Sequence, residues 1–182
     1  MRNLILILLL SFSFLGNAQQ FARPDSDVTN TNWTGGFASI DEVTFSDLDY
    51  AWSPDKPSTG TDILEVSLSD VTDPTVGTGH TMRFRLARHD GGIVGASRGS
   101  AVTGLVYLYQ GATLIATAYN ATVTDAFVEY TYNLTTTEAN NITDYTDLRI
   151  RFDASGGAGK PANKRGLATS WAELEVPDVP GS

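Results

Sequence analysis

Cysteine is absent from the chain, and histidine is scarce. Without cysteine no disulfide can brace the fold and no lipid can be anchored on a cysteine, so stability must come from a buried apolar core. His80 and His89 are the two histidines, and their separation of nine residues makes a poor zinc site. Any metal would therefore be held by oxygen ligands.

Basic side chains are also scarce, above all in the first part of the chain. The formal net charge is −9, and Arg23 and Lys56 are the two basic residues of the acidic segment 19–79. Proteins that bind nucleic acid gain most of their affinity by neutralising phosphates with lysine and arginine. The charge balance excludes nucleic acid as the expected partner and indicates a well-solvated acidic surface.

Long hydrophobic runs are missing except at the start of the chain. Arg2 precedes an apolar run from Leu4 to Leu15, and a stretch of small residues ending at Ala18 follows. The run is shorter than the ~20 residues of a membrane-spanning helix, and its flanks are those of a secretory signal peptide. We predict a signal peptide over residues 1–18, one domain over 19–182, and a secreted, extracellular or cell-envelope location without a membrane span after signal removal.

Apolar and polar residues alternate with a period of two from residue 62 onward. This pattern is typical of strands with one buried and one solvated face, as antiparallel sheets have. Turn residues separate the runs, so the sequence predicts an all-β fold, an antiparallel β-sandwich resembling a jelly roll. The residues expected to face the core are Leu64, Val66, Leu68, Met82, Phe84, Leu86, Val106, Leu108, Val128, Tyr130, Tyr132, Leu134, Leu148, Ile150, Phe152, Ala172, Leu174 and Val176.

A single helical signal interrupts the strand pattern. Thr135 stands three residues before Glu138, which is the spacing of a capping box. We therefore predict one short helix near residues 135–142, between two strands.

Four arginines occupy outward positions of the alternation, two in each of two strands. They are Arg83, Arg85, Arg149 and Arg151. By the same parity Glu173 and Glu175 point outward from the last strand. Acid paired against base across neighbouring strands contributes roughly 0.2–1 kcal/mol per pair. We expect a structural charge ladder, and a ligand-binding surface is the alternative.

Several stretches, in order along the chain, resemble a known β-sandwich module. They are "ARPDSDVTNTNWT" at 22–34, "IDEVTFSDLDY" at 40–50, "EVSLSDVTDP" at 65–74, "NLTTTEANNITDYTDLRIRF" at 133–152 and "SWAELEVPD" at 170–178. That module recurs in bacteriophage and prophage structural proteins and in bacterial surface proteins of unassigned role. The resemblance implies a non-catalytic structural or display module and carries over no catalytic residue. A signal peptide is unusual on a virion protein and favours the cell envelope.

Aromatic residues are the most informative outward side chains. If Val106 and Leu108 face the core, Tyr107 and Tyr109 lie on the outer face of the same strand, and parity also places Trp171 outward. Flat rings on a sheet can stack on sugar rings, and a row of exposed rings indicates a contact surface. A glycan and a protein subunit are the two partners that we consider for these three residues, and cover by another strand or a loop of the same chain is the third alternative.

Paired carboxylates provide a third functional alternative, a glycoside hydrolase. Glu173 and Glu175 stand two residues apart on one strand face, ~7 Å from each other along the strand, a separation that suits paired catalytic carboxylates. Proline at position 177 ends the strand before Asp178 can join them. We therefore predict that the protein is not an enzyme.

Acidic residues of the first half are the candidates for a metal site. Asp25, Asp27, Asp41 and Glu42 supply oxygen ligands of the kind that calcium prefers, without the sequence of a calcium-binding loop. A structural calcium ion is thus an alternative to the expectation of no cofactor.

These observations lead to one main hypothesis and two alternatives. The main hypothesis is a non-catalytic extracellular module of a cell envelope or virion that assembles or adheres through its sheet faces, with a homo-oligomer among the forms considered. The alternatives are a carbohydrate-binding module that uses the exposed aromatic residues and the glycoside hydrolase. An open groove around the tyrosines would favour glycan, and a flat surface with apolar neighbours would favour assembly.

Overall fold

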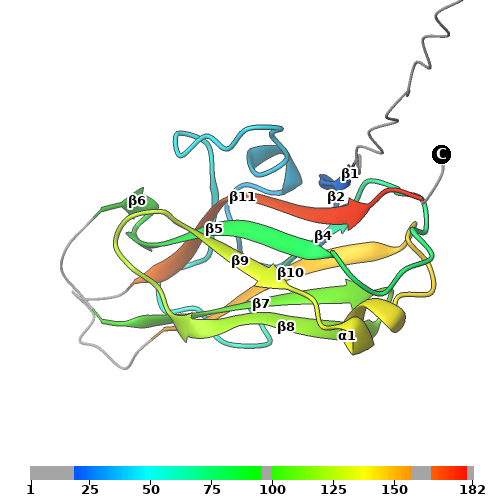
Figure 1. The fold of residues 1–182 in the computed structure, drawn as a ribbon. Coiled ribbons are helices and arrows are strands. Elements are labelled where there is room, and N and C mark those ends of the chain that lie inside the picture. The colour runs from blue at the N-terminus through cyan, green and yellow to red at the C-terminus, as the bar shows by residue number, and fades with distance from the viewer. Residues whose placement is uncertain (1–18, 96–99, 157–164, 180–182) are drawn as a thin grey trace, which may run out of the picture.

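The computed structural model describes residues 19–95, 100–156 and 165–179, which fold into two sheets packed face to face (Figure 1). The signal peptide predicted over residues 1–18 lies outside the described residues. No described helix is long and apolar enough to cross a membrane.

Sheet I has the strand order β1–β11–β5–β6, with β3 beside β11 and β9 beside β5. Its strands are β1 (Gln19–Ala22), β3 (Ala51–Trp52), β5 (Thr81–Asp90), β6 (Ile93–Val94), β9 (Val128–Asn133) and β11 (Gly166–Pro177).

Sheet II has the order β2–β4–β10–β7–β8. Its strands are β2 (Pro24–Asn30), β4 (Leu64–Leu68), β7 (Val102–Gln110), β8 (Thr113–Thr122) and β10 (Leu148–Gly156). Every strand pairing described in the two sheets is antiparallel. The predicted all-β antiparallel sandwich is confirmed.

The core lies between the sheets, where the alternation placed it. Phe84 of β5 and Ile150 of β10 are both 0% exposed, and Val106 and Leu108 of β7 are fully buried as well. Their strand neighbours on the outer faces, such as Arg151, are half-buried. The alternation therefore reports correctly which side chains of the central strands face inward.

Burial departs from simple alternation in several strands, among them β11 and β9. In β11 both faces are buried from Gly166 to Val176, and the pairing register with β5 shifts between Thr169 and Trp171. In β9 the predicted inward Val128 is 38% exposed, because β9 is hydrogen-bonded to β5 on one side only. Strands at an edge lack a second neighbour to cover them.

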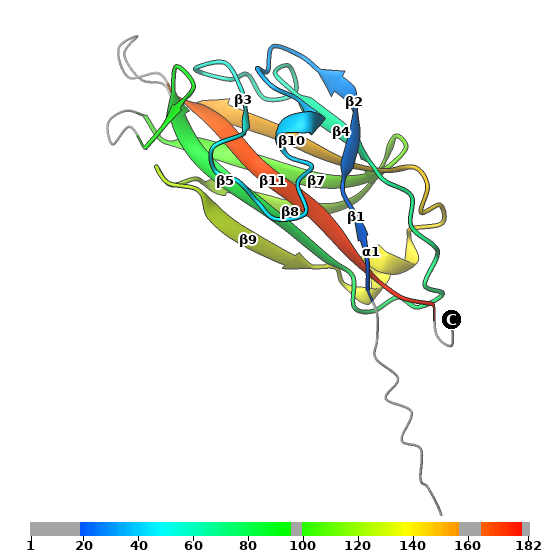
Figure 2. The same cartoon turned by 90° about the horizontal axis from the view of Figure 1, so that it is seen from above.

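Residues 31–50 explain the two-sided burial of β11. This segment includes the 3-10 helix η1 (Phe37–Ser39) and crosses over β11 and β5 on the outer side of sheet I (Figure 2). This segment therefore covers the outward side chains of β11 and shields them from water.

The predicted helix is confirmed as α1 (Thr136–Asn140). The side chain of Thr135 accepts a hydrogen bond from the backbone N–H of Glu138 at 3.3 Å, and the Glu138 carboxylate accepts one from the backbone N–H of Thr135 at 2.8 Å. This capping box satisfies backbone donors at the helix start that no helical carbonyl can reach.

We expect Phe84→Ala or Ile150→Ala to lower the free energy of unfolding by ~2–5 kcal/mol, because each empties a packed core position. Urea unfolding monitored by circular dichroism measures the change. Thr117→Ala on the exposed face of β8 is the matched control and should stay within ~0.5 kcal/mol of the wild type. Equal losses in all three variants would contradict the assignment of the core.

Acidification below neutral pH should destabilise the fold through its two histidines. Burial lowers the pKa of both His80 and His89 below the ordinary value of 6.5. The unfolded chain therefore binds these protons more readily, and stability falls as the pH drops through about 6.5. Urea unfolding between pH 7.5 and 5.5 measures this decrease, which His89→Gln should reduce. An unchanged free energy of unfolding over that interval would contradict the prediction.

Candidate functional site

The outer face of sheet II carries two rows of side chains in register across four strands. Residues paired directly across antiparallel strands share a face, so the pairing register defines the rows. Running from β4 over β10 and β7 to β8, the first row is Ser67, Arg149, Tyr109 and Leu114, and the second is Glu65, Arg151, Tyr107 and Thr117. We call these eight residues the tyrosine face.

The two tyrosines form a contacting pair at the centre of this face. Their ring centroids lie 6.1 Å apart and their planes meet at 63°. Both side chains are half-buried. Partial burial, and after it the negative charge of Asp153, raises the pKa of Tyr107 above its ordinary value. Tyr107 is therefore a neutral phenol at physiological pH and can donate a hydrogen bond.

Arg149 is held firmly beside the pair. Its Nε and Nη2 donate to the Asp147 carboxylate at 3.0 and 2.8 Å, and its Nη1 lies 3.4 Å from Glu65. The hydrogen bond to Asp147 is the main cause that raises the pKa of Arg149. This part of the predicted charge ladder is structural.

Arg151 pairs with Glu65 on β4 and with Tyr107 on β7 in the strand register, but its contacts differ from those of Arg149. Its guanidinium carbon lies 5.9 Å from the centroid of the Tyr109 ring. Its Nε is buried without a hydrogen-bond partner. The residue as a whole is half-buried and belongs to the polar border of the tyrosine pair.

The loop between β3 and β4 closes one end of the tyrosine face. Asp153, which is buried, accepts hydrogen bonds from the backbone N–H groups of Gly60 and Ala154 at 2.8 and 2.7 Å. Thr59 donates its hydroxyl to the Ala154 carbonyl at 3.1 Å. These bonds fix the loop against β10 and limit the face on that side.

Trp171, the third predicted aromatic contact, lies elsewhere. It occupies the outer face of sheet I, opposite the tyrosines, and is only 6% exposed. Its Nε1 donates to the Glu42 carbonyl at 2.8 Å, and its ring meets the edge of Phe45. The prediction that Trp171 is exposed is wrong, because the segment between β2 and β3 folds over it.

Glu173 and Glu175 are engaged by arginine. Glu173 lies 2.8 Å from Arg23 and 3.3 Å from Arg83, and Arg83 also pairs with Glu175. Both glutamates are buried. Arg83 and Glu173 are direct partners between β5 and β11, which confirms the predicted ladder at this point. The two carboxylates proposed for a glycoside hydrolase thus form ion pairs that hold sheet I together.

Asp25 and Asp27, two of the acidic residues predicted as calcium ligands, take part in hydrogen bonds within the fold. Asp25 accepts a hydrogen bond from the hydroxyl of Ser67, and Asp27 accepts one from the backbone N–H of Phe37 at 2.8 Å. Burial is the main cause that raises the pKa of Glu42. A backbone hydrogen bond partly opposes this rise, and the nearby negative charge of Asp41 adds to it. Among residues 19–95, 100–156 and 165–179, no group of three or more acidic or histidine side chains is placed to hold a metal ion.

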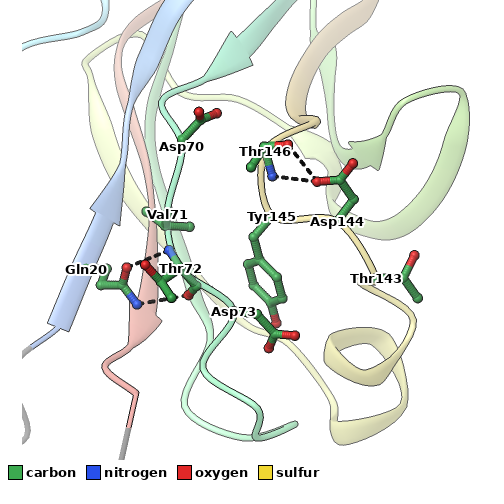
Figure 3. A pocket seen from close by; sticks show the side chains of 9 residues that line it. All are labelled: Gln20, Asp70, Val71, Thr72, Asp73, Thr143, Asp144, Tyr145 and Thr146. Carbon is green, nitrogen blue, oxygen red and sulfur yellow. Dashed lines mark hydrogen bonds between the residues drawn. The ribbon is translucent and has the colours of Figure 1, made fainter. Parts of the chain in front are cut away.

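A pocket of about 530 Å³ opens at the end of the sandwich where β1 begins (Figure 3). Asp144 accepts hydrogen bonds from the backbone and the hydroxyl of Thr146, and Gln20 exchanges two hydrogen bonds with the backbone of Thr72. Tyr145 shares a hydrogen bond of 2.7 Å with the buried His80, and burial raises the pKa of Tyr145 to about 12. These contacts join the loops at this end, so we assign the pocket a structural role.

Comparison with known proteins relates the chain to solved β-sandwich structures. No protein-family model and no curated protein matches it. One similar structure, described as "CBM4 structure and function", is 17% identical with a TM-score of 0.40, over 69% of this chain and 81% of that chain. Another is the N-terminal cellulose-binding domain of the Cellulomonas fimi β-1,4-glucanase C, 18% identical with a TM-score of 0.38, over 86% of this chain and 97% of that chain. The likeness concerns the fold alone and carries no functional argument.

Sequence reasoning placed Tyr107 and Tyr109 on one outer face but missed their neighbours. Leu114 and Thr117 join the face because the register between β7 and β8 shifts twice, and the sequence gives no sign of these shifts. The alternation predicted that Arg151 points outward as part of the charge ladder. In the structure Glu65 and Asp147 pair with Arg149 instead of Arg151. The alternation placed Arg151 on an outer face, and the pairing of β10 with β7 makes it a neighbour of the tyrosines.

We expect Tyr107→Ala and Tyr109→Ala each to change the free energy of unfolding by ~1 kcal/mol or less, because both rings lie outside the core. Glu173→Ala should cost ~2–3 kcal/mol, less than the ~3–5 kcal/mol for a fully enclosed ion pair, because Arg23 and Arg83 are partly exposed. Urea unfolding of the three variants measures both effects. A larger loss for the tyrosine variants than for Glu173→Ala would contradict this assignment.

Proposed function

We propose that the protein is a non-catalytic glycan-binding module whose binding surface is the tyrosine face. The observation that carries this proposal is the contacting pair of half-exposed rings, Tyr107 and Tyr109, on the outer face of sheet II. The C–H groups of a sugar ring pack well against an aromatic ring. Because the two ring centroids lie 6.1 Å apart, a sugar ring that packs on one tyrosine can also contact the other.

The neighbours of the rings favour a sugar over a protein subunit. Stable protein interfaces have an apolar centre depleted of charged residues. Here the rings are bordered by Arg149, Arg151, Glu65 and Thr117, and the exposed apolar neighbour is Leu114. Fixed hydrogen-bonding groups beside an aromatic surface match the alternating hydroxyl and C–H groups of a glycan.

The proposed compartment and the lack of catalysis agree with this function. The signal peptide proposed for residues 1–18 would carry the chain to where extracellular glycans are found. The carboxylates of Glu173 and Glu175, on sheet I, form ion pairs with Arg23 and Arg83, so they are not available as an acid and a nucleophile.

A second candidate is a display module of a cell envelope or virion that assembles through an apolar surface. Leu48 and Ile93 are 95% and 69% exposed, and they line a cavity of about 450 Å³ together with Tyr50 and Phe127. Exposed apolar side chains of this size gathered around a hollow are typical of protein contact sites. The tyrosine face and this surface share no residue, so they can be tested separately.

We expect residues 19–182 to bind at least one glycan on an array, and the double variant Tyr107→Ala, Tyr109→Ala to lower the affinity about ten-fold or more, because it removes both stacking surfaces. Isothermal titration calorimetry with the glycan identified on the array measures the change. Phe21→Ala removes an exposed ring of sheet I and is the matched control, for which we expect unchanged affinity.

Light scattering of the same samples tests the second candidate. A protein that binds no glycan on the array but forms an oligomer, and that dissociates in the double variant Leu48→Ser, Ile93→Ser, would overturn the glycan proposal in favour of assembly.

A further inference from the structure

Arg151 stands apart from the other arginines that the structure describes. Each of the others lies within 4.0 Å of a carboxylate oxygen, and these are Arg23, Arg83, Arg85, Arg88, Arg149 and Arg165. Within residues 19–95, 100–156 and 165–179, Arg151 has no ion pair, and its Nε is buried without a hydrogen-bond partner. Among these described residues, no carboxylate therefore forms an ion pair with Arg151.

The carboxylates nearest to Arg151 in the sheet are committed to other donors. Glu65 is its direct partner on β4, but the Glu65 carboxylate lies 3.4 Å from Arg149. Asp153, two residues along β10, accepts hydrogen bonds from the backbone N–H groups of Gly60 and Ala154. Asp147 is bound to Arg149. Each of these three carboxylates thus has a partner other than Arg151.

The position of Arg151 beside the two tyrosines suits it to contact a ligand that lies on their rings. It is the direct partner of Tyr107 between β10 and β7, and its guanidinium carbon lies 5.9 Å from the centroid of the Tyr109 ring. A guanidinium is planar and weakly hydrated, and its forked N–H donors match the two oxygens of a carboxylate. Because Arg151 is half-buried, a ligand on the tyrosine rings can reach it from the solvent side.

We infer that the glycan bound on the tyrosine face contains uronic acid residues, with Arg151 binding the sugar carboxylate while Tyr107 and Tyr109 pack against the sugar rings. This inference rests on the proposed function of that face. The net charge of −9 disfavours unspecific adsorption of polyanions to the protein. Binding of an acidic glycan must therefore come from a local site.

The test compares each acidic oligosaccharide with its own carboxyl-reduced form. The probes are oligogalacturonides and alginate oligosaccharides, together with the same oligosaccharides after reduction of each carboxylate to a hydroxymethyl group. Isothermal titration calorimetry with residues 19–182 should show about ten-fold tighter binding of at least one native acid than of its reduced partner. The reduced partner keeps the sugar rings and loses the group that Arg151 recognises.

Two variants assign the preference to Arg151. Arg151→Gln should lower the affinity for the native acid to that of the reduced form and leave the affinity for the reduced form unchanged. Arg151→Lys keeps the charge without the fork and should retain only part of the preference. Urea unfolding checks that both variants are folded, and Phe21→Ala again serves as the control.

The outcomes separate this inference from the proposed function. Equal binding of native and reduced forms, or a preference that survives in Arg151→Gln, overturns the inference and leaves the glycan-binding function intact. If the wild-type protein binds only neutral glycans on the array, the uronic acid inference is likewise overturned and the glycan-binding function stands. If the wild-type protein binds no glycan, both the uronic acid inference and the proposed function are overturned. If the double tyrosine variant binds as tightly as the wild type, the tyrosine face is not the binding site.

Discussion

The structure depends on one constraint, the closure of an apolar layer between two pleated sheets. Phe84 and Ile150 can be buried together only if β5 and β10 present alternate residues to the gap, and this fixes the direction of every side chain between them. The outward position of Arg151 follows from the burial of Ile150 and Phe152 on either side of it. The surface chemistry of the central strands is thus set by the core.

The two outer faces of the sandwich meet different surroundings. The segment between β2 and β3 crosses sheet I, where it buries Trp171 and brings Asp47 within 2.7 Å of Arg85. Glu173 and Glu175 are buried there as well, and they form ion pairs with Arg23 and Arg83. On sheet II the loop between β3 and β4 reaches only to Asp153. The rings of Tyr107 and Tyr109 therefore stay accessible.

The tyrosine face is held in place by bonds that do not involve a ligand. Arg149 joins Asp147 and Glu65, and Asp153 fixes the neighbouring loop to β10. A surface that is already ordered loses less conformational freedom on binding than a mobile loop does. Arg151 is the polar member of the face whose Nε is buried without a hydrogen-bond partner among the described residues.

The sequence by itself determined the long strands after residue 62, the inward residues of the central strands and the capping box of Thr135 and Glu138, because each of these depends on spacing along the chain. Only the tertiary structure decided which outer face stays open. Parity places Trp171 and Tyr107 outward alike, and the difference between them is a segment far away in the sequence that covers one and not the other. The same holds for the arginines: Arg149 and Arg151 share a strand face, and the three-dimensional positions of Asp147 and Glu65 pair Arg149, while Arg151 has no ion pair among the described residues.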